Sequence, residues 1–212
     1  MIKLYGFPTS PYTRLVALVC KEERIAYEFI NVDVFGKREH KEATFMEKQP
    51  FGQVPYIDDN GFILYESHAI ARYLIKKYSS QAPLIPTDLR EEALFEQAAS
   101  IERSNFNPFV APIVYEKLLK PRRGLQPNEA RISELLTTLN RNMDAYDVIL
   151  GKQKYLAGDS VTLADLSHLP FGAAFFRLDA SFAEVFESRP NVARWWKDIT
   201  NRPTWLAVKD GA

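Results

Sequence analysis

The chain has 212 residues, of which 46% are hydrophobic and 25% are charged, and its 27 basic residues balance its 27 acidic ones. A chain of this length and composition buries a sizeable core, which excludes a disordered protein and one that depends on disulfide or metal staples. The balanced charge provides no field that would draw the chain to nucleic acid or to a membrane surface. A small molecule or another protein is therefore the expected partner.

Cys20 is the only cysteine of the sequence. One cysteine forms no intramolecular disulfide and leaves no cysteine cluster for a metal centre, which is typical of a reducing compartment. The amino-terminal residues have no signal-peptide pattern, and no window approaches the roughly 18 apolar residues of a membrane span. These features predict a cytoplasmic protein, and Cys20 is expected to pack as a small hydrophobe.

Residues 1–78 alternate strand and helix patterns. Ile2–Phe7 and Tyr27–Val32 are rich in apolar, aromatic and β-branched residues, which predicts two strands. Between them we expect a helix with one apolar face, formed by Tyr12, Leu15, Val16 and Val19. A strand, a helix and a strand in this order predict a parallel pair.

Two further apolar runs, Val54–Ile57 and Phe62–Tyr65, surround the dipeptide Asn60-Gly61. This pattern is a strong signal for an antiparallel hairpin, so the sheet is expected to be mixed. A second helix should begin near Ser67. Residues 1–78 are therefore predicted to form an α/β unit of thioredoxin-like type.

Residues 79–88 contain two serines and two prolines and predict a linker. Residues 89–212 show helical spacing throughout and predict an all-helical domain. Pro108 and Pro112 should bend or break the first of its helices. The helices are expected at roughly Leu89–Leu119, Asn128–Leu150, Thr162–Leu178 and Asn191–Asn201.

A capping box is expected at the start of the third of these helices. Thr162 stands at the N-cap position, and Asp165 stands where the side chain that accepts from the N-cap amide belongs. Val161 and Leu166 occupy the positions of a hydrophobic staple. We expect this motif to be structural.

Polar residues occur at the ends of two predicted strands. Ser10 follows the first strand, where the N-terminus of a helix favours a bound anion; alternatively Ser10 or Thr9 is an ordinary helix cap. Glu66 and Ser67 stand at a similar junction, where they could hold an ammonium and a carboxylate or simply cap the helix. Each junction alone leaves both interpretations open.

The segment before the third strand contains Val54-Pro55. Proline donates no hydrogen bond to a sheet, so the main chain of Val54 is free for a peptide-like ligand or simply belongs to a turn. His40 and Lys41 lie in a polar stretch that by default is solvated. The three histidines are far apart and have no metal-binding spacing, and no glycine-rich nucleotide loop is present, so neither a metal site nor nucleotide chemistry is expected.

Taken together, these segments resemble glutathione transferases, with details similar to the phi class of plants and fungi. The resemblance extends over nearly the whole chain and depends on the order and spacing of its motifs. These are Phe7–Arg14, Arg38–Lys41, Pro50–Pro55, Tyr65–Ile70, Tyr155–Asp165 and Arg189–Trp196.

The resemblance implies a cytosolic transferase fold, glutathione as the co-substrate, and no metal. It also implies a homodimer to which Phe51 and the first long helix of the second half contribute. It implies that Ser10 donates a hydrogen bond to the glutathione sulfur, with Thr13 as helper or substitute. The implied tripeptide contacts are His40 and Lys41 at the glycine carboxylate, Gln53, the main chain of Val54 before a cis Pro55, and Glu66 and Ser67 at the γ-glutamyl group.

The expected electrophile is small and apolar, such as a halogenated aromatic, an isothiocyanate or a hydroperoxide, the last by peroxidase activity. Aromatic residues of both halves are candidates for its site, namely Phe7, Tyr12, Phe35, Phe106, Phe109, Tyr115 and Phe175. Two alternatives stay open: storage of hydrophobic ligands without catalysis, and an interaction module on the same scaffold. Disulfide reduction is disfavoured because position 10 is serine.

Overall fold

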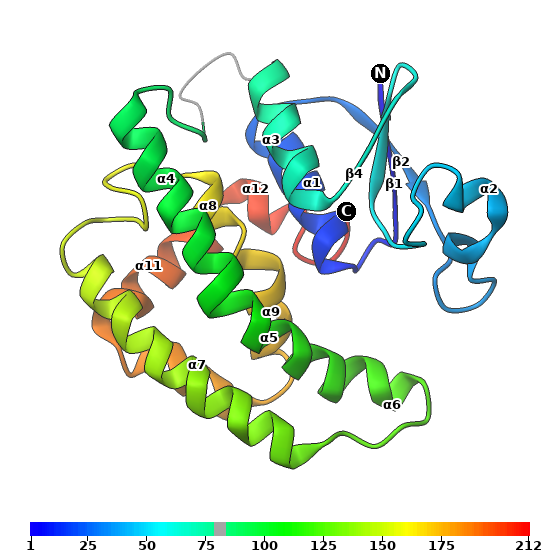
Figure 1. The fold of residues 1–212 in the computed structure, drawn as a ribbon. Coiled ribbons are helices and arrows are strands. Elements are labelled where there is room, and N and C mark those ends of the chain that lie inside the picture. The colour runs from blue at the N-terminus through cyan, green and yellow to red at the C-terminus, as the bar shows by residue number, and fades with distance from the viewer. Residues whose placement is uncertain (79–83) are drawn as a thin grey trace. The chain divides into compact units, whose positions relative to one another are not determined.

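The computed structural model describes residues 1–78 and 84–212, which form two compact units (Figure 1). The first unit comprises residues 1–85 and 203–212, and the second comprises residues 86–202. Part of the predicted linker, residues 79–83, lies outside the described residues. The sequence prediction placed everything after residue 88 in the helical domain, whereas the last ten residues return to the first unit.

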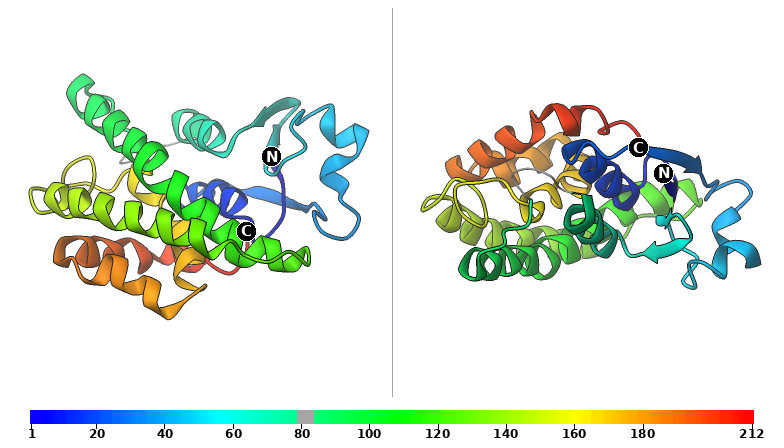
Figure 2. Two further views of the ribbon diagram at one scale, coloured as in Figure 1. Left: turned by 60° about the horizontal axis from the view of Figure 1, so that its bottom comes forward. Right: turned by 90° about the horizontal axis from the view of Figure 1, so that it is seen from above.

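The first unit contains a mixed sheet with the strand order β2-β1-β3-β4, as predicted. β1 pairs with β2 in parallel, and the β1–β3 and β3–β4 pairs are antiparallel. Helices α1 and α3 pack side by side, while the short α2 lies across the sheet from them (Figure 1 and Figure 2). The elements are β1 Ile2–Gly6, α1 Pro11–Glu22, β2 Tyr27–Asn31, the 3-10 turn η1 Glu39–Lys41, α2 Ala43–Met46, β3 Tyr56–Asp59, β4 Phe62–Tyr65 and α3 Ser67–Tyr78.

The β3–β4 hairpin turns at the predicted dipeptide. Asn60 and Gly61 have φ angles of 54° and 94°, and a two-residue turn of this kind requires positive φ at both positions. Asp58 supports the turn by accepting a 2.7 Å hydrogen bond from the Gly61 amide. The hairpin predicted from Asn-Gly is therefore confirmed.

Helix α1 is buried more completely than its sequence predicted. Residues 13–20 are all buried, whereas Tyr12, which we expected on the apolar face, is 40% exposed. The reason is that α1 packs against α3 and also against α12, Pro203–Leu206, so that it has no solvated side along these residues. Cys20 is buried as predicted, and burial raises the pKa of its thiol to about 12.

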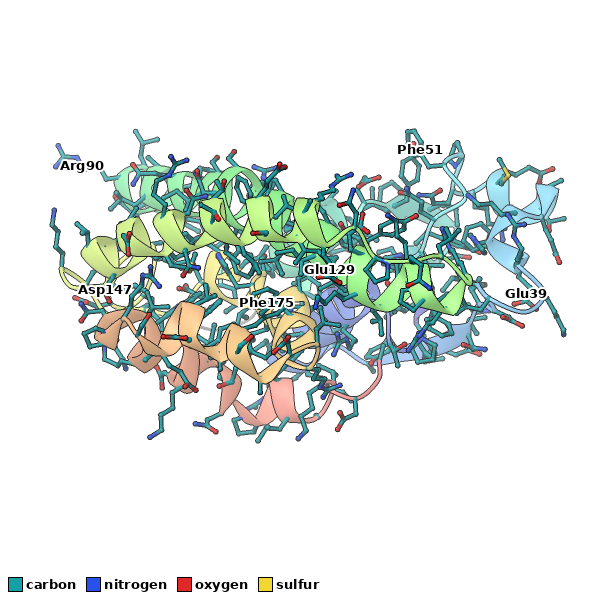
Figure 3. The ribbon with its side chains drawn as sticks, turned by 90° about the horizontal axis from the view of Figure 1, so that it is seen from below. Glu39, Phe51, Arg90, Glu129, Asp147 and Phe175 are labelled. Atoms are coloured by element: carbon teal, nitrogen blue, oxygen red, sulfur yellow. The ribbon has the colours of Figure 1, made fainter. Side chains whose placement is uncertain are left out.

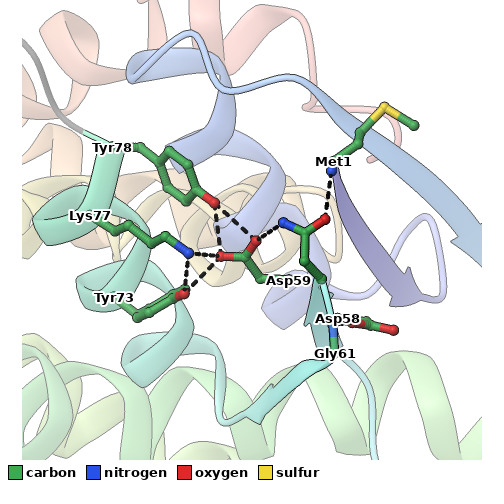
Figure 4. Close-up of polar contacts among 8 residues, drawn as sticks. Met1, Asp58, Asp59, Gly61, Tyr73, Lys77 and Tyr78 are labelled. Carbon is green, nitrogen blue, oxygen red and sulfur yellow. Dashed lines mark hydrogen bonds and ion pairs between the residues drawn. The ribbon is translucent and has the colours of Figure 1, made fainter.

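A buried carboxylate joins the hairpin to the C-terminal half of α3. Asp59 accepts hydrogen bonds from the hydroxyls of Tyr73 at 2.7 Å and Tyr78 at 2.8 Å, and from the Lys77 ammonium at 2.6 Å (Figure 4). Burial opposes its ionisation, but these donors together lower the pKa of Asp59 to about 2. The cluster fixes the end of α3 against β3.

The second unit is built from helices, as predicted. No helix among the described residues of the chain is both long enough and apolar enough for a membrane span. The elements are α4 Leu89–Ile101, the π-helical turn η2 Glu102–Phe106, α5 Asn107–Val114, the π-helical turn η3 Tyr115–Leu119, α6 Lys120–Arg122, α7 Glu129–Leu150, α8 Leu163–Leu166, α9 Leu169–Phe176, the 3-10 turn η4 Ala180–Ala183, α10 Glu184–Glu187 and α11 Pro190–Thr200.

Prolines interrupt the regular hydrogen bonding of two predicted helices. The segment 89–122 stays helical through Pro108 and Pro112, and the wider turns η2 and η3 occur beside them. A π-helical turn changes the hydrogen-bond partners where proline cannot donate. Further along, the single helix predicted for Thr162–Leu178 is divided into α8 and α9, and Pro170 stands in the first turn of α9.

The predicted cap at the start of α8 is present. The Asp165 carboxylate accepts 2.9 Å hydrogen bonds from both the backbone amide and the hydroxyl of Thr162. It also accepts from the Leu156 amide at 2.9 Å and from the Trp195 indole at 3.0 Å, two partners that the sequence did not indicate. Burial raises the pKa of Asp165, and these donors oppose the rise. Through the same hydrogen bonds, the cap joins three segments of the unit.

Candidate functional site

Ser10 lies at the junction between β1 and α1. Its backbone is extended, its amide donates to the Phe7 carbonyl at 3.0 Å, and its carbonyl accepts from the Arg14 amide at 2.9 Å. Pro11 follows in the first turn of the helix. The Ser10 hydroxyl makes no capping hydrogen bond, so the alternative of an ordinary side-chain cap is not what the structure adopts. A half-buried hydroxyl therefore stands at a helix end whose dipole favours an anion.

The side chain of Thr13 packs against the end of β1 at Gly6. Its side chain is fully buried, and a Cβ at Gly6 would lie 2.4 Å from its methyl carbon and 2.7 Å from its hydroxyl oxygen. Within the part of the chain that the structure describes, the Thr13 hydroxyl has no hydrogen-bond partner. This position suits close packing of α1 against β1 more than contact with a ligand.

The predicted residues His40 and Lys41 are brought beside the segment before β3. The Lys41 ammonium donates to the Phe51 carbonyl at 3.2 Å. Gly52 has a φ of 58°, and a Cβ there would lie 2.8 Å from both the His40 carbonyl and the Lys41 ammonium. Only glycine fits at position 52, so close to the main chain of His40. This close approach places the exposed Lys41 ammonium near the start of β3.

Val54 lies just outside the sheet. The Val54–Pro55 peptide bond is cis, and the ladder of β3 begins at Tyr56. Gln53 is exposed, and its backbone amide donates at 3.0 Å to the side-chain oxygen of Gln49, which is buried. Sequence reasoning missed Gln49 because a single glutamine in a polar stretch carries no pattern.

Glu66 forms the junction between β4 and α3 in a left-handed conformation. Its φ is 70°, which is costly for a residue with a side chain, and it is exposed. Its carbonyl accepts from the Ile70 amide at 2.8 Å, so Glu66 precedes the helix and Ser67 is its first residue. The alternative in which Ser67 is the cap is therefore wrong by one position. Ser67 is buried at the N-terminus of α3.

The loop after β2 is organised by one carboxylate. Asp33 accepts hydrogen bonds from the amides of Phe35 at 3.1 Å, Gly36 at 2.7 Å and Lys37 at 3.0 Å, and these bonds lower its pKa. The Asp33 amide in turn donates to the Glu39 carboxylate at 2.7 Å. An aspartate shortly before a glycine is the signal that could have indicated this turn.

The aromatic candidates of the first unit flank the Ser10 turn. The rings of Phe7 and Phe35 meet edge to face at 5.2 Å, and Phe35 and Tyr12 are 43% and 40% exposed. These three side chains give the turn an apolar border that solvent reaches. They suit contact with an apolar ligand.

The aromatic candidates of the second unit fall into two groups. Phe106 and Phe175 are fully buried, and each packs against another ring of the same unit. They are core residues and present no surface to a ligand, which differs from the sequence expectation because helix packing turns them inward. Phe109 and Tyr115 are half-buried.

Among the residues that the structure describes, no group of three histidine, cysteine, aspartate or glutamate side chains is arranged to hold a metal ion. The predicted glutathione contacts all belong to the first unit. They lie in the 3-10 turn η1, in the loop before β3 and at the junction of β4 with α3, and are His40, Lys41, Gln53, Val54, Pro55, Glu66 and Ser67.

Comparison with known proteins identifies the family. Residues 4–82 match the model of the glutathione S-transferase N-terminal domain, and residues 100–203 match that of the C-terminal domain. Glutathione S-transferase PM239X14 of Arabidopsis thaliana is 43% identical over 199 residues, which cover 92% of this chain and 89% of that protein. The chain belongs to the glutathione S-transferase family.

Solved structures agree with this assignment. Glutathione transferase F7 of Populus trichocarpa superposes with a TM-score of 0.93 at 35% identity, covering 98% of this chain and 97% of that one. Maize glutathione S-transferase I, solved in complex with an atrazine glutathione conjugate, gives a TM-score of 0.90 at 31% identity, covering 98% and 96%. Similarity to F-type transferases confirms the phi class expected from the sequence.

Proposed function

We propose that the chain is a transferase that joins glutathione to small hydrophobic electrophiles, and that Ser10 stabilises the glutathione thiolate. One observation carries the role of Ser10: its hydroxyl stands at the N-terminus of the 12-residue helix α1 and is not used to cap it. A donor at a positive helix end favours an anion such as a thiolate. Ser10 acts by hydrogen bonding, so no general base is needed.

The energies are of the right size for this role. A free thiol has a pKa of about 8.5, so only a few per cent is thiolate at neutral pH, and thiolate is the nucleophile. Lowering the pKa by about two units takes about 2.7 kcal/mol of preferential stabilisation. A charge-assisted hydrogen bond contributes about 1.5–3 kcal/mol and a helix end adds several tenths.

The two charged ends of glutathione have matching groups. At one end, the exposed Lys41 ammonium, with His40, suits the glycine carboxylate. At the other, the exposed Glu66 carboxylate suits the γ-glutamyl ammonium, and Ser67 at the start of α3 suits its carboxylate. The strained φ of Glu66 supports a functional role, since such conformations gather at ligand sites.

The middle of the tripeptide would pair with the main chain of Val54. This residue precedes β3 and stands beside the exposed side chain of Gln53, a further contact. An extended peptide can add to a sheet through such main-chain groups. Fixing the cysteinyl residue at Val54 would set the position of the sulfur relative to Ser10.

The electrophile would be apolar, and the exposed rings of Tyr12 and Phe35, with Phe7 packed edge to face on Phe35, would border it. With a halogenated aromatic, the thiolate forms a carbon–sulfur bond, and the halide leaves with the electron pair of the broken bond. For the second expected activity, the thiolate would attack the terminal oxygen of a hydroperoxide; the O–O bond breaks, the alcohol leaves, and glutathione becomes the sulfenic acid. A second glutathione then displaces water from that sulfur, which gives glutathione disulfide. The similar maize glutathione S-transferase I was solved with an atrazine glutathione conjugate.

We also infer that the chain works in the cytoplasm as a homodimer. Phe51 is 63% exposed and stands out from the surface (Figure 3), with its ring 6.2 Å from that of Tyr65. An exposed aromatic on a turn suits burial in a partner copy. Substitution of Phe51 by serine should therefore weaken the dimer in sedimentation experiments.

Turnover of a halogenated aromatic by Ser10→Ala tests the function, and Thr9→Ala is the matched control because Thr9 is exposed on the same turn. We expect kcat/KM to fall about tenfold to a hundredfold for Ser10→Ala, as loss of a charge-assisted hydrogen bond implies, and to stay within about twofold for Thr9→Ala. Equal losses in both variants would contradict the role of Ser10. Binding of glutathione and apolar ligands by the wild type without turnover would favour ligand storage.

A further inference from the structure

The C-terminal segment, residues 203–212, packs on the helix that carries Ser10 at its start. Helix α12 within this segment packs against α1, and Figure 1 shows the end of the chain beside α1. Trp205 and Val208 are 2% and 1% exposed and anchor the segment. The Thr204 hydroxyl donates a hydrogen bond to the carboxylate of Glu22, which lies at the other end of α1. The segment therefore runs along the whole helix.

Its last residue reaches the turn before Ser10. The Ala212 amide donates to the Pro8 carbonyl at 3.0 Å. Gly211 lies close to the same proline, since a Cβ at that glycine would be 3.8 Å from the Pro8 Cβ. Pro8 is two residues before Ser10, so this bond fixes the backbone on the strand side of the candidate catalytic serine.

A second contact holds the helix side. The Arg14 guanidinium donates to the Lys209 carbonyl at 2.6 Å and lies 5.5 Å from the centre of the Trp205 ring. The Arg14 side chain is 4% exposed. Its backbone amide donates to the Ser10 carbonyl at 2.9 Å, so Arg14 touches both the C-terminal segment and Ser10. The segment thus holds the chain two residues before Ser10 and four residues after it.

We propose that the C-terminal segment positions the Ser10 hydroxyl, with Arg14 as a positioning residue and the Ala212 amide as the second point of attachment. The inference depends on the proposed role of Ser10 in holding the thiolate. A hydroxyl that stabilises an anion by hydrogen bonding must keep its distance and direction, and small displacements of such groups reduce rates strongly. The two hydrogen bonds of the C-terminal segment, one on each side of Ser10, provide this restraint.

The test uses a pair of variants that differ in one donor. Ala212→Pro removes the amide N–H that bonds Pro8, and Ala212→Val keeps it. For both, kcat/KM is measured against pH with glutathione and a halogenated aromatic, beside the wild type and Ser10→Ala. We expect Ala212→Pro to reduce kcat/KM about fivefold at neutral pH and to shift the profile toward higher pH, as weaker thiolate stabilisation requires. Ala212→Val should follow the wild type.

A second pair tests the helix side. Arg14→Met leaves the Lys209 carbonyl without its donor, while Arg14→Lys keeps a cation but loses the planar group that stacks on Trp205. We expect the pH profile to shift in Arg14→Met and to return part of the way in Arg14→Lys. If the Arg14 variants fail to fold, the Ala212 pair decides alone.

The outcomes separate the two proposals. Profiles of Ala212→Pro and Ala212→Val that coincide, beside a wild type that differs from Ser10→Ala, would overturn the positioning role and leave the proposed function standing. A wild type whose profile matches that of Ser10→Ala would overturn both. A shift confined to Ala212→Pro and Arg14→Met supports the restraint.

Discussion

The two units treat their buried acids differently. In the first unit, Asp59 receives an ammonium and two tyrosine hydroxyls, and its pKa falls to about 2. In the second unit, Glu102 is just as buried and accepts from the side-chain amide of Asn107 at 3.1 Å, and burial raises the pKa of Glu102 to about 7. The comparison teaches that burial raises the pKa of a carboxyl, and that a cation with several donors reverses this effect.

Asp165 combines both influences, because burial raises its pKa while several donors oppose the rise. Its removal should have the largest effect on stability. Asp165→Ala leaves buried donors of Thr162, Leu156 and Trp195 without an acceptor, so we expect a loss of about 3–5 kcal/mol in the free energy of unfolding. Denaturant unfolding measures this. Asp144→Ala is the control, because the Asp144 side chain is 68% exposed and should cost less than about 1 kcal/mol. Equal losses would contradict the role of the cap.

Glu102 predicts a pH dependence of the second unit. Between the unfolded pKa of 4.5 and the folded pKa of about 7, the unfolded chain releases a proton that the folded chain retains. Stability should therefore fall as pH rises through this window, by about 3 kcal/mol. Thermal unfolding of Glu102→Gln should lack this fall, so the variant should be the more stable at pH 8. A wild type with flat stability over this range would show that Glu102 ionises normally.

Asp59 predicts the opposite pH dependence for the first unit, whose stability should rise with pH. Its pKa is lowered from 3.8 to about 2, so its contribution is fully present above pH 3.8 and is lost as pH falls through 2. We expect about 2 kcal/mol from this group, and Asp59→Asn should remove both that stability and its acid dependence. Unfolding curves between pH 2 and pH 5 measure the difference. An unchanged acid transition in the variant would refute the cluster as its source.

The smallest effect is expected at Thr13. Because its buried hydroxyl has no hydrogen-bond partner among the described residues, Thr13→Val should change stability by less than about 1 kcal/mol and leave turnover within about twofold. Thermal unfolding and initial rates check both values. A large loss of kcat with normal folding would instead restore Thr13 as a helper of Ser10.

Local patterns predicted the parts of the fold that local forces decide. Asn60-Gly61 indicated the hairpin because few residues adopt its φ angles, and Thr162 with Asp165 indicated a cap whose partners lie three residues apart. Ser10 and Glu66 were found because both stand where a strand meets a helix.

Contacts between distant residues could not be read in this way. Arg14 reaches Lys209 across 195 positions, and Asp59 meets Tyr78 across 19, spacings that no periodicity encodes. The same holds for Phe106, which looked like a pocket residue because an aromatic side chain has the same sequence pattern in a core and in a ligand site. The return of residues 203–212 to the first unit depends on such contacts as well.

The role of Ser10 is tested most directly by the ultraviolet absorbance of the glutathione thiolate in the binary complex, titrated against pH. We predict that the wild type lowers the pKa of the bound thiol by about two units relative to free glutathione, and that Ser10→Ala binds glutathione without this shift. A bound thiol that titrates at the same pH in both proteins would contradict the account.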